Sequence, residues 1–126
     1  MRTQTITDAE SQVMEVLWRS GGAVSAEQVV GELVSQRQWQ EPTIKTLLNR
    51  LLKKGAIAAE KDGRRYLYTA VLQREQWVTS ESSQLLDRLF GGRIAPLVAH
   101  FGSRSKLNQA DIEELTRLIE GMRDDS

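Results

Sequence analysis

The 126-residue sequence contains no cysteine and only one histidine, His100. The missing thiols exclude a disulfide framework, a cysteine-ligated zinc site and a thiol nucleophile. A single imidazole also leaves too few ligands for a histidine-rich metal site. The sequence has no Ser-His-Asp spacing, no glycine-rich phosphate loop and no metal-ligand set. We therefore expect neither an enzyme nor a protein that binds a metal or another cofactor.

The sequence also has no long apolar run and no net charge. No stretch approaches the ~18 residues of a membrane span, and the N-terminus begins no apolar signal segment, so we expect a cytoplasmic protein without membrane insertion. The 17 basic and 17 acidic side chains cancel, which excludes a uniformly basic protein that coats DNA. With 40% hydrophobic and 27% charged residues, the composition is typical of a folded globular domain.

One segment departs from this neutrality. Between residues 42 and 65, seven basic side chains stand against two acidic ones, which gives a net charge of +5 in 24 residues. A concentrated basic segment in a neutral protein favours an anionic partner, although a solvated charged surface is the common alternative. The elements on which these residues fall distinguish the two interpretations.

Capping residues and apolar spacing predict three helices in the first half of the chain. Thr7 and Ser25 each begin a capping box, and the glycine pair at 21–22 ends the first helix. Pro42 suits the first turn of the third helix, which ends at Gly55. One side of this third helix is a continuous aliphatic stripe, typical of a buried face. The stripe consists of Ile44, Leu47, Leu48, Leu51 and Leu52.

A two-stranded hairpin is predicted after the third helix. Two β-prone runs, 57–61 and 64–69, flank an Asp-Gly pair at 62–63 that favours a tight turn. Three helices followed by a two-stranded wing are the winged variant of the helix-turn-helix, so the predicted fold is mainly α. We interpret Tyr66 and Tyr68 as packing against the helices rather than stacking on bases, because the hairpin needs one buried face.

The C-terminal part is predicted to be helical. We expect a helix over about 73–90, a short one that begins at Pro96, and a third capped by Asn108. This divides the chain into a winged-helix DNA-binding domain, 1–72, and a helical dimerisation domain, 73–126. The second domain is too small to bury its own apolar stripes, so we expect a symmetric homodimer to cover them. The predicted dimer contacts are Val78, Leu85, Leu89, Ile112, Leu115, Ile119 and Met122.

The basic segment coincides with the third helix and the wing. In a helix-turn-helix protein, the exposed face of the recognition helix lies in the major groove and contacts phosphates and base edges. The sequence therefore predicts binding to double-stranded DNA. A winged-helix adaptor that uses the same helix against a protein is the alternative. The candidate DNA-binding residues are Thr43, Lys45, Thr46, Asn49, Arg50, Lys53, Lys54, Lys61, Arg64 and Arg65.

Three segments of the sequence are similar to one known group of regulators. They are Thr7-Asp8-Ala9-Glu10 with Val13-Met14 and Leu17-Trp18, the third-helix segment at 43–55, and the hairpin segment at 61–68. The segment at 43–55, TIKTLLNRLLKKG, is the most specific of the three. Together they resemble the BlaI/MecI/CopY family of penicillinase-type repressors.

The resemblance implies a dimeric winged-helix repressor on palindromic operators of resistance or copper-handling genes. Members of the family leave DNA after proteolysis signalled through a membrane-bound receptor protease, or after binding copper. Copper-sensing members use a C-terminal Cys-x-Cys pair, which this cysteine-free sequence lacks. β-Lactam-responsive members are cut at an Asn-Phe bond in the fifth helix. The matching pair here, His100-Phe101, is the candidate cleavage site, and it keeps the phenylalanine but not the asparagine.

Overall fold

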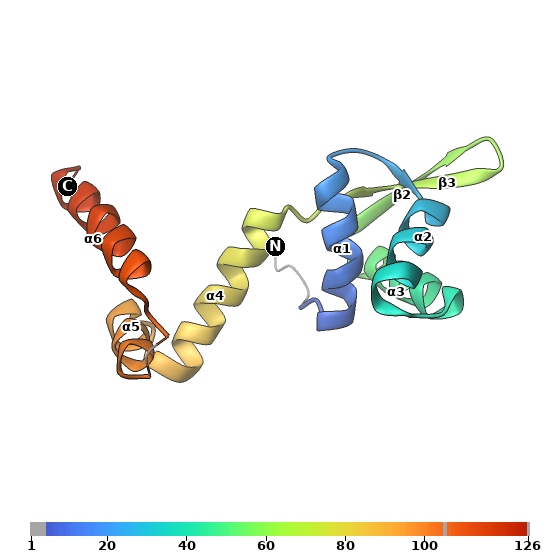
Figure 1. The fold of residues 1–126 in the computed structure, drawn as a ribbon. Helices are drawn as coiled ribbons and strands as arrows, with labels where there is room; N and C mark the ends of the chain where they lie inside the picture. Colours follow the sequence, from blue (N-terminus) through green and yellow to red (C-terminus); the bar gives the residue numbers. More distant parts are fainter. Residues whose placement is uncertain (1–4, 105, 126) are drawn as a thin grey trace. The chain divides into compact units, whose positions relative to one another are not determined.

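The computed structural model describes residues 5–104 and 106–125 (Figure 1). These residues form six helices and a small antiparallel sheet, in the order expected for a winged helix followed by a helical region. The predicted mainly α fold is therefore confirmed. The chain divides into two compact units, Met1–Val78 and Thr79–Ser126, which we describe separately.

The three helices of the first unit begin at the predicted signals, and the first and third end at the predicted glycines. They are α1 (Asp8–Ser20), α2 (Ala26–Arg37) and α3 (Glu41–Lys54). At the start of α1, the Thr7 hydroxyl oxygen accepts from the Glu10 N–H at 3.1 Å, and Glu10 Oε1 accepts from the Thr7 N–H at 2.8 Å. Ser25 and Gln28 form the same capping box at the start of α2. Gly55 ends α3 with a φ of 75°, which glycine adopts without steric cost.

The sheet has three strands rather than the predicted two. Its strands are β1 (Val24–Ser25), β2 (Ile57–Asp62) and β3 (Arg65–Ala70), in the order β1-β3-β2. β1 pairs Val24 with Tyr68 and Ser25 with Leu67, so the wing is joined to the start of α2. Two residues are too few to show a strand pattern, and the pairing is long-range, which is why the sequence did not predict β1.

The hairpin turn also lies one residue later than predicted. Asp62 pairs with Arg65 at the end of the ladder, so the two-residue loop is Gly63-Arg64 rather than Asp62-Gly63. Gly63 has a φ of 66°, and a glycine at the first loop position suits a tight turn that matches the strand twist. The shift places Arg64 at the tip of the wing.

The core of the first unit is formed by the aliphatic faces of α1, α2 and α3 and by the base of the wing. Its largest fully buried side chains include Met14, Leu17, Leu33, Ile44, Leu48 and Leu51. The α3 stripe is buried as predicted, except that Leu52 is half-buried. Because α3 packs with this stripe inward, its opposite face is free to contact a partner.

The beginning of α4 (Arg74–Phe90) belongs to the first unit. The Trp77 ring lies 5.4 Å from the Trp18 ring of α1, measured between centroids, and the Trp18 indole N–H donates to the Leu72 carbonyl at 2.8 Å. Arg74 Nε also lies 3.3 Å from Glu15 Oε1 of α1. The division between the compact units, after Val78, therefore falls inside α4 rather than before it.

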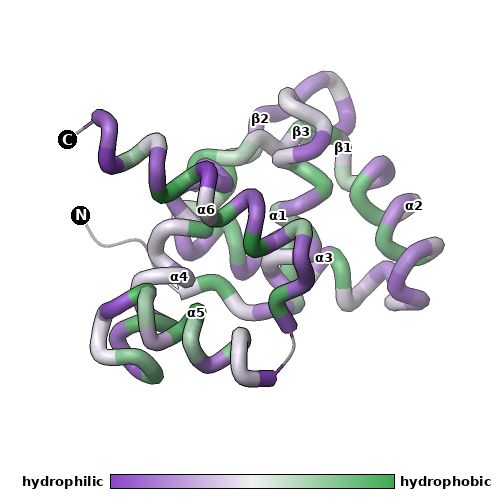
Figure 2. The backbone as a smooth tube through the Cα atoms, turned by 60° about the vertical axis from the view of Figure 1, so that its left-hand side comes forward, coloured by the Kyte–Doolittle hydropathy of each residue, from purple (hydrophilic) through white to green (hydrophobic). Residues whose placement is uncertain are grey.

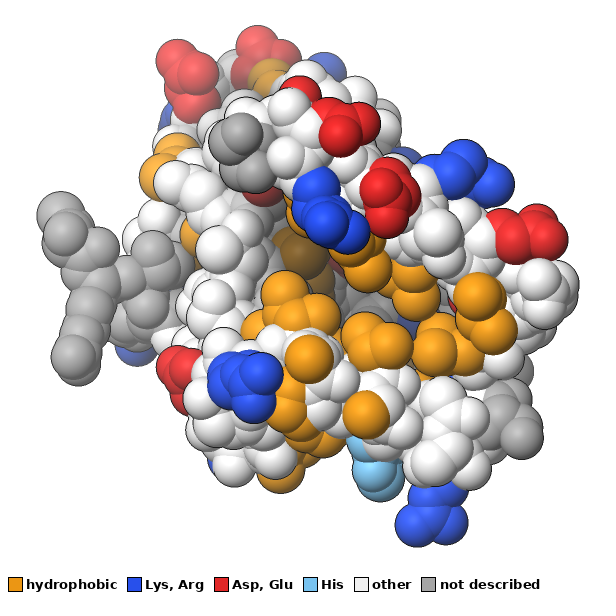
Figure 3. Space-filling view, turned by 90° about the vertical axis from the view of Figure 1, so that its left-hand side faces the viewer, with side chains coloured by type: hydrophobic (Ala, Val, Ile, Leu, Met, Phe, Trp, Pro, Cys, Tyr) orange, Lys and Arg blue, Asp and Glu red, His pale blue; other side chains and the backbone are white. Residues whose placement is uncertain are grey.

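The second unit exposes apolar side chains on its helices. Besides the rest of α4 it contains α5 (Ile94–Ser103) and α6 (Gln109–Asp124), and none of its described residues is buried. Figure 2 shows hydrophobic stretches along these helices, and Figure 3 shows hydrophobic side chains gathered on one face. Helices of a folded unit normally bury such a stripe, so this unit lacks a core of its own.

Candidate nucleic-acid interface

The outer face of α3 is polar and exposed. Thr43, Lys45, Thr46, Asn49, Arg50 and Lys53 are all exposed there. Within the described residues, the side chains of Asn49 and Arg50 have no hydrogen-bond or ion-pair partner. The Thr46 hydroxyl donates to the Pro42 carbonyl at 2.9 Å, which leaves its methyl group and an oxygen lone pair for a partner. This face can therefore offer amide and guanidinium donors to base edges or phosphates.

Lys45 has an acidic neighbour on the same helix. Its Nζ lies 3.1 Å from Glu41 Oε2, one turn earlier, and both side chains are more than half exposed. An exposed ion pair of this spacing contributes only about 0.3–0.5 kcal/mol, so Lys45 can exchange Glu41 for a phosphate at little cost.

Lys54, unlike the other candidate residues of α3, is largely covered and makes its contacts within the protein. Its Nζ donates to Glu10 Oε1 at 2.5 Å and to the Thr5 carbonyl at 2.9 Å, and only 21% of its side chain is exposed. The ammonium therefore ties the end of α3 to the start of α1. The sequence identified Glu10 as a capping residue but gave no sign of this long-range partner.

The Glu10 carboxylate is buried, with 1% of its side chain exposed. Burial raises its pKa, but the hydrogen bond and positive charge of Lys54, together with the Thr7 hydrogen bonds, outweigh burial and hold the pKa below the ordinary value of 4.5. Its Oε2 atom has no hydrogen-bond partner among the described residues. Lys54 is therefore the main compensation for a buried negative charge.

The wing places basic side chains at its tip. Lys61, Arg64 and Arg65 are exposed, and Arg65 lies 3.5 Å from Asp62 across the turn. Tyr68 packs against the core, as predicted, but Tyr66 is 51% exposed, so the expected packing of Tyr66 is wrong. Alternation along β3 gives both tyrosines the same face, and only Tyr68 is close enough to the helices to be covered by them.

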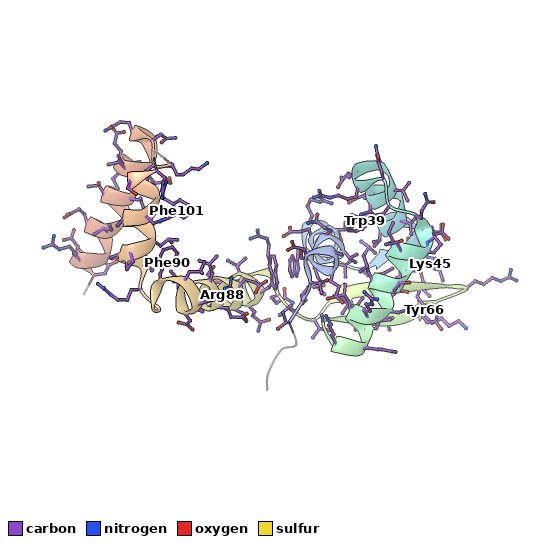
Figure 4. All side chains as sticks on the ribbon, turned by 90° about the horizontal axis from the view of Figure 1, so that it is seen from below. Trp39, Lys45, Tyr66, Arg88, Phe90 and Phe101 are labelled. Carbon is purple, nitrogen blue, oxygen red and sulfur yellow. The ribbon has the colours of Figure 1, made fainter. Side chains whose placement is uncertain are left out.

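A groove of about 580 Å³ lies between α2, α3 and the wing. Its base includes Leu48, Val30 and Tyr68, which are buried or half-buried. Exposed polar and charged side chains surround this base: Glu27, Glu41, Lys45, Asn49, Arg64, Arg65 and Tyr66. Figure 4 labels Lys45 on α3 and Tyr66 on the wing. The groove thus brings together basic residues from both elements that were predicted to contact DNA.

The predicted dimer contacts lie on α4 and α6. Leu115 is half-buried and the other six are exposed. Ile94 and Leu118 are further exposed apolar residues that the prediction did not include. Apart from Val78, which is in the first unit, the predicted contacts belong to the unit without a buried core.

The candidate cleavage site lies inside α5. The His100 and Phe101 rings are 5.3 Å apart, edge to face, and Phe101 is 39% exposed. The Phe101 carbonyl accepts from the N–H groups of Arg104 and Lys106 at 3.2 and 3.0 Å. The bond between His100 and Phe101 is therefore held in helical conformation.

Metal-binding clusters and membrane-spanning helices are both absent from residues 5–104 and 106–125. No group of three or more His, Cys, Asp or Glu residues there could hold a metal ion. No helix in the same residues is both long and apolar enough to cross a membrane.

The chain is similar to known repressors along most of its length. It matches the penicillinase repressor family model over residues 6–121. The penicillinase repressor of Bacillus licheniformis is 33% identical, covering 91% of this chain and 89% of that protein. The methicillin resistance regulatory protein MecI of Mammaliicoccus sciuri is 32% identical, covering 94% of this chain and 95% of that protein.

A solved structure of a relative matches more than half of the chain. The solution structure of the Bacillus licheniformis BlaI monomeric form in complex with the blaP half-operator is 36% identical, with a TM-score of 0.53. The match covers 60% of this chain and 90% of that one. Sequence, winged-helix fold and relatives therefore agree that the chain belongs to the penicillinase repressor family.

Proposed function

We propose that this chain is a DNA-binding transcriptional repressor that occupies palindromic operators as a homodimer. The observation that carries the proposal is the coincidence of exposed basic side chains with the outer face of α3 and with the wing tip. The similar BlaI structure is a complex with a half-operator, which supports the same use of the fold. The regulated genes are proposed to be resistance genes, in line with the names of the relatives.

In this proposal α3 lies in the major groove and the wing contacts the neighbouring backbone. Lysine and arginine side chains bind phosphates, while Asn49, Arg50 and the two threonines are placed to reach base edges. Lys54 is excluded because Glu10 and Thr5 occupy its ammonium. The proposed DNA-binding residues are Thr43, Lys45, Thr46, Asn49, Arg50, Lys53, Lys61, Arg64 and Arg65.

Alanine at Asn49 or at Arg50 is expected to weaken DNA binding in distinguishable ways. If Arg50 contacts a guanine edge, Arg50→Ala should cost about 1–3 kcal/mol of binding free energy and remove the preference for one base pair. If Arg50 contacts a phosphate, Arg50→Ala should weaken binding to all sequences equally. Asn49→Ala should relax an adenine preference. The measurement is a titration of each protein with a duplex that the wild-type chain selects, and with single-base-pair variants of that duplex.

Arg117→Ala is the matched control for Arg50→Ala, because it removes an exposed arginine from α6 instead of α3. It should leave the affinity unchanged. If Asn49→Ala and Arg50→Ala both bind like the wild type, α3 is not in the major groove.

The homodimer is supported by the second unit. Large apolar side chains, including Leu118, Ile119 and Met122, are more than half exposed there, and none of its described residues is buried. A second copy with the same stripes would cover them symmetrically. A twofold arrangement also matches two half-sites of a palindromic operator.

Release from DNA is proposed to follow proteolysis of the His100–Phe101 bond by a membrane-bound receptor protease. The bond precedes α6 in the chain, so cutting it separates Ile112–Met122 from the winged helix. Its helical conformation means that α5 must unwind before a protease can bind it as an extended segment.

Mass spectrometry of the chain from cells given a β-lactam checks the proposed cleavage. A fragment that ends at His100 is expected, and Phe101→Ala should reduce its amount. An intact chain in fully derepressed cells would contradict cleavage and favour release by another signal.

A further inference from the structure

Tyr66 is an exposed aromatic residue within the basic surface. It is 51% exposed, and no other described residue forms a hydrogen bond with its hydroxyl group. In the β2–β3 ladder it pairs with Lys61, nearer the tip than Tyr68, which lies between β1 and β2. Its side chain lines the groove beside Lys45 and Asn49 of α3. The hydroxyl group therefore contributes little to the fold, whatever the covered half of the ring contributes.

The groove has the position and charge that a nucleic-acid backbone needs. If α3 occupies a major groove and the wing reaches the next minor groove, one sugar-phosphate strand must run between them. Lys45, Arg64 and Arg65 supply positive charge along this path. This step rests on the proposed DNA-binding function.

Two acidic side chains restrict where the strand can run. Glu41 is paired with Lys45, while Glu27 lies at the start of α2 and carries no ion pair within the described residues. An unpaired carboxylate repels phosphate, so the α2 end of the groove is the less favourable one. The strand is then expected between α3 and the wing, where Tyr66 lies.

We infer that Tyr66 positions this strand, with its hydroxyl donating to a phosphate oxygen and its ring packing on the adjacent sugar. A phenol suits the role because it is an apolar body with one polar end. Hydrogen bonds to a charged oxygen are short and stronger than those between neutral groups. The contact carries no information on base identity, so Tyr66 adds affinity and fixes the position of the wing.

The test compares Tyr66→Phe with the wild type on a duplex that the wild-type chain enriches from a random-sequence library. Loss of the hydroxyl should weaken binding about ten-fold for each half-site. The loss should be the same for every sequence variant of the duplex. The salt dependence should not change, because a neutral phenol displaces no counterion, whereas Arg65→Ala should reduce the log–log slope by about 0.9.

A series of duplexes, each with a neutral methylphosphonate in place of one phosphate, locates the contact. At the contacted phosphate the wild type should lose affinity and Tyr66→Phe should lose almost none further. Thermal unfolding of Tyr66→Phe should match that of the wild type, because the hydroxyl has no partner in the protein.

The outcomes separate the inference from the proposed function. A wild-type chain that enriches no duplex overturns DNA binding itself, and the inference with it. A wild type that binds while Tyr66→Phe binds equally well overturns only the inference. A loss confined to one base pair also overturns it, because Tyr66 would then read a base instead of a phosphate.

Discussion

Replacing Leu115 and Ile119 with aspartate should convert the proposed homodimer into a folded monomer and weaken binding to a full operator. Ile119 is 53% exposed in the single chain, and Leu115 lies one turn away on the same stripe of α6. In a dimer, two unpaired carboxylates from each copy would be buried at this contact, which is strongly unfavourable. Once the two winged helices are unlinked, each half-site must be occupied independently, which costs about 10²–10⁴-fold in apparent affinity.

Sedimentation and operator binding measure the two effects together. The control is Arg117→Asp with Gly121→Asp, which places two aspartates at the same four-residue spacing on the other side of α6. Both control positions are exposed, and a Cβ atom added at Gly121 meets no other heavy atom within 4 Å. The control should remain dimeric. If the Leu115/Ile119 variant dimerises as strongly as the wild type, the interface lies elsewhere, for instance on α4.

Lys54→Met should destabilise the winged helix by about 3 kcal/mol, because it removes one partner of a buried ion pair. The Glu10 carboxylate would keep the Thr7 hydrogen bonds but lose Lys54, and its Oε2 atom already has no partner. Lys53→Met is the matched control, since Lys53 is exposed on the proposed DNA surface. Lys53→Met should change stability by less than about 0.5 kcal/mol and weaken DNA binding instead.

The stability difference between wild type and Lys54→Met should also depend on pH. The pKa of Glu10 is lowered in the folded chain, so ionised Glu10 stabilises the fold above the unfolded value near 4.5, and this contribution is lost as pH falls through the folded pKa. Without Lys54, only the Thr7 hydrogen bonds oppose the effect of burial, so the Glu10 pKa should be higher in the variant than in the wild type, and acidification should destabilise the variant less. Urea unfolding at several pH values measures the free energy of unfolding of both proteins, and the difference between them should be largest near neutral pH. If this difference is constant or grows in acid, the ion-pair role of Lys54 is contradicted.

Local signals were sufficient for the helices of the first unit. The capping boxes at Thr7 and Ser25 and the glycine at 55 act through neighbouring backbone groups, and the structure contains each of them. The α3 stripe has the 3.6-residue period of a helix, so its inner and outer faces were predictable together. The outer face includes most of the candidate DNA-binding residues.

Long-range contacts account for what the sequence did not predict. Lys53 and Lys54 are adjacent and chemically identical, but one helical step turns Lys54 toward α1, where Glu10 lies. Tyr66 and Tyr68 share a strand face, and only the position of the helices makes one of them half-exposed. The Trp18–Trp77 contact depends on where α4 begins relative to α1. Periodicity alone cannot specify any of these three relations.

Binding of double-stranded DNA through α3 and the wing is tested most directly by the salt dependence of the wild-type affinity for its selected duplex. The logarithm of the affinity should fall linearly with that of the salt concentration, by about 0.9 for each phosphate contacted. With six to ten contacts, the affinity should drop about 10³–10⁵-fold between roughly 50 and 200 mM salt, and Arg64→Ala with Arg65→Ala should flatten the slope. A flat response in the wild type, or a slope that these substitutions leave unchanged, would contradict binding through this surface.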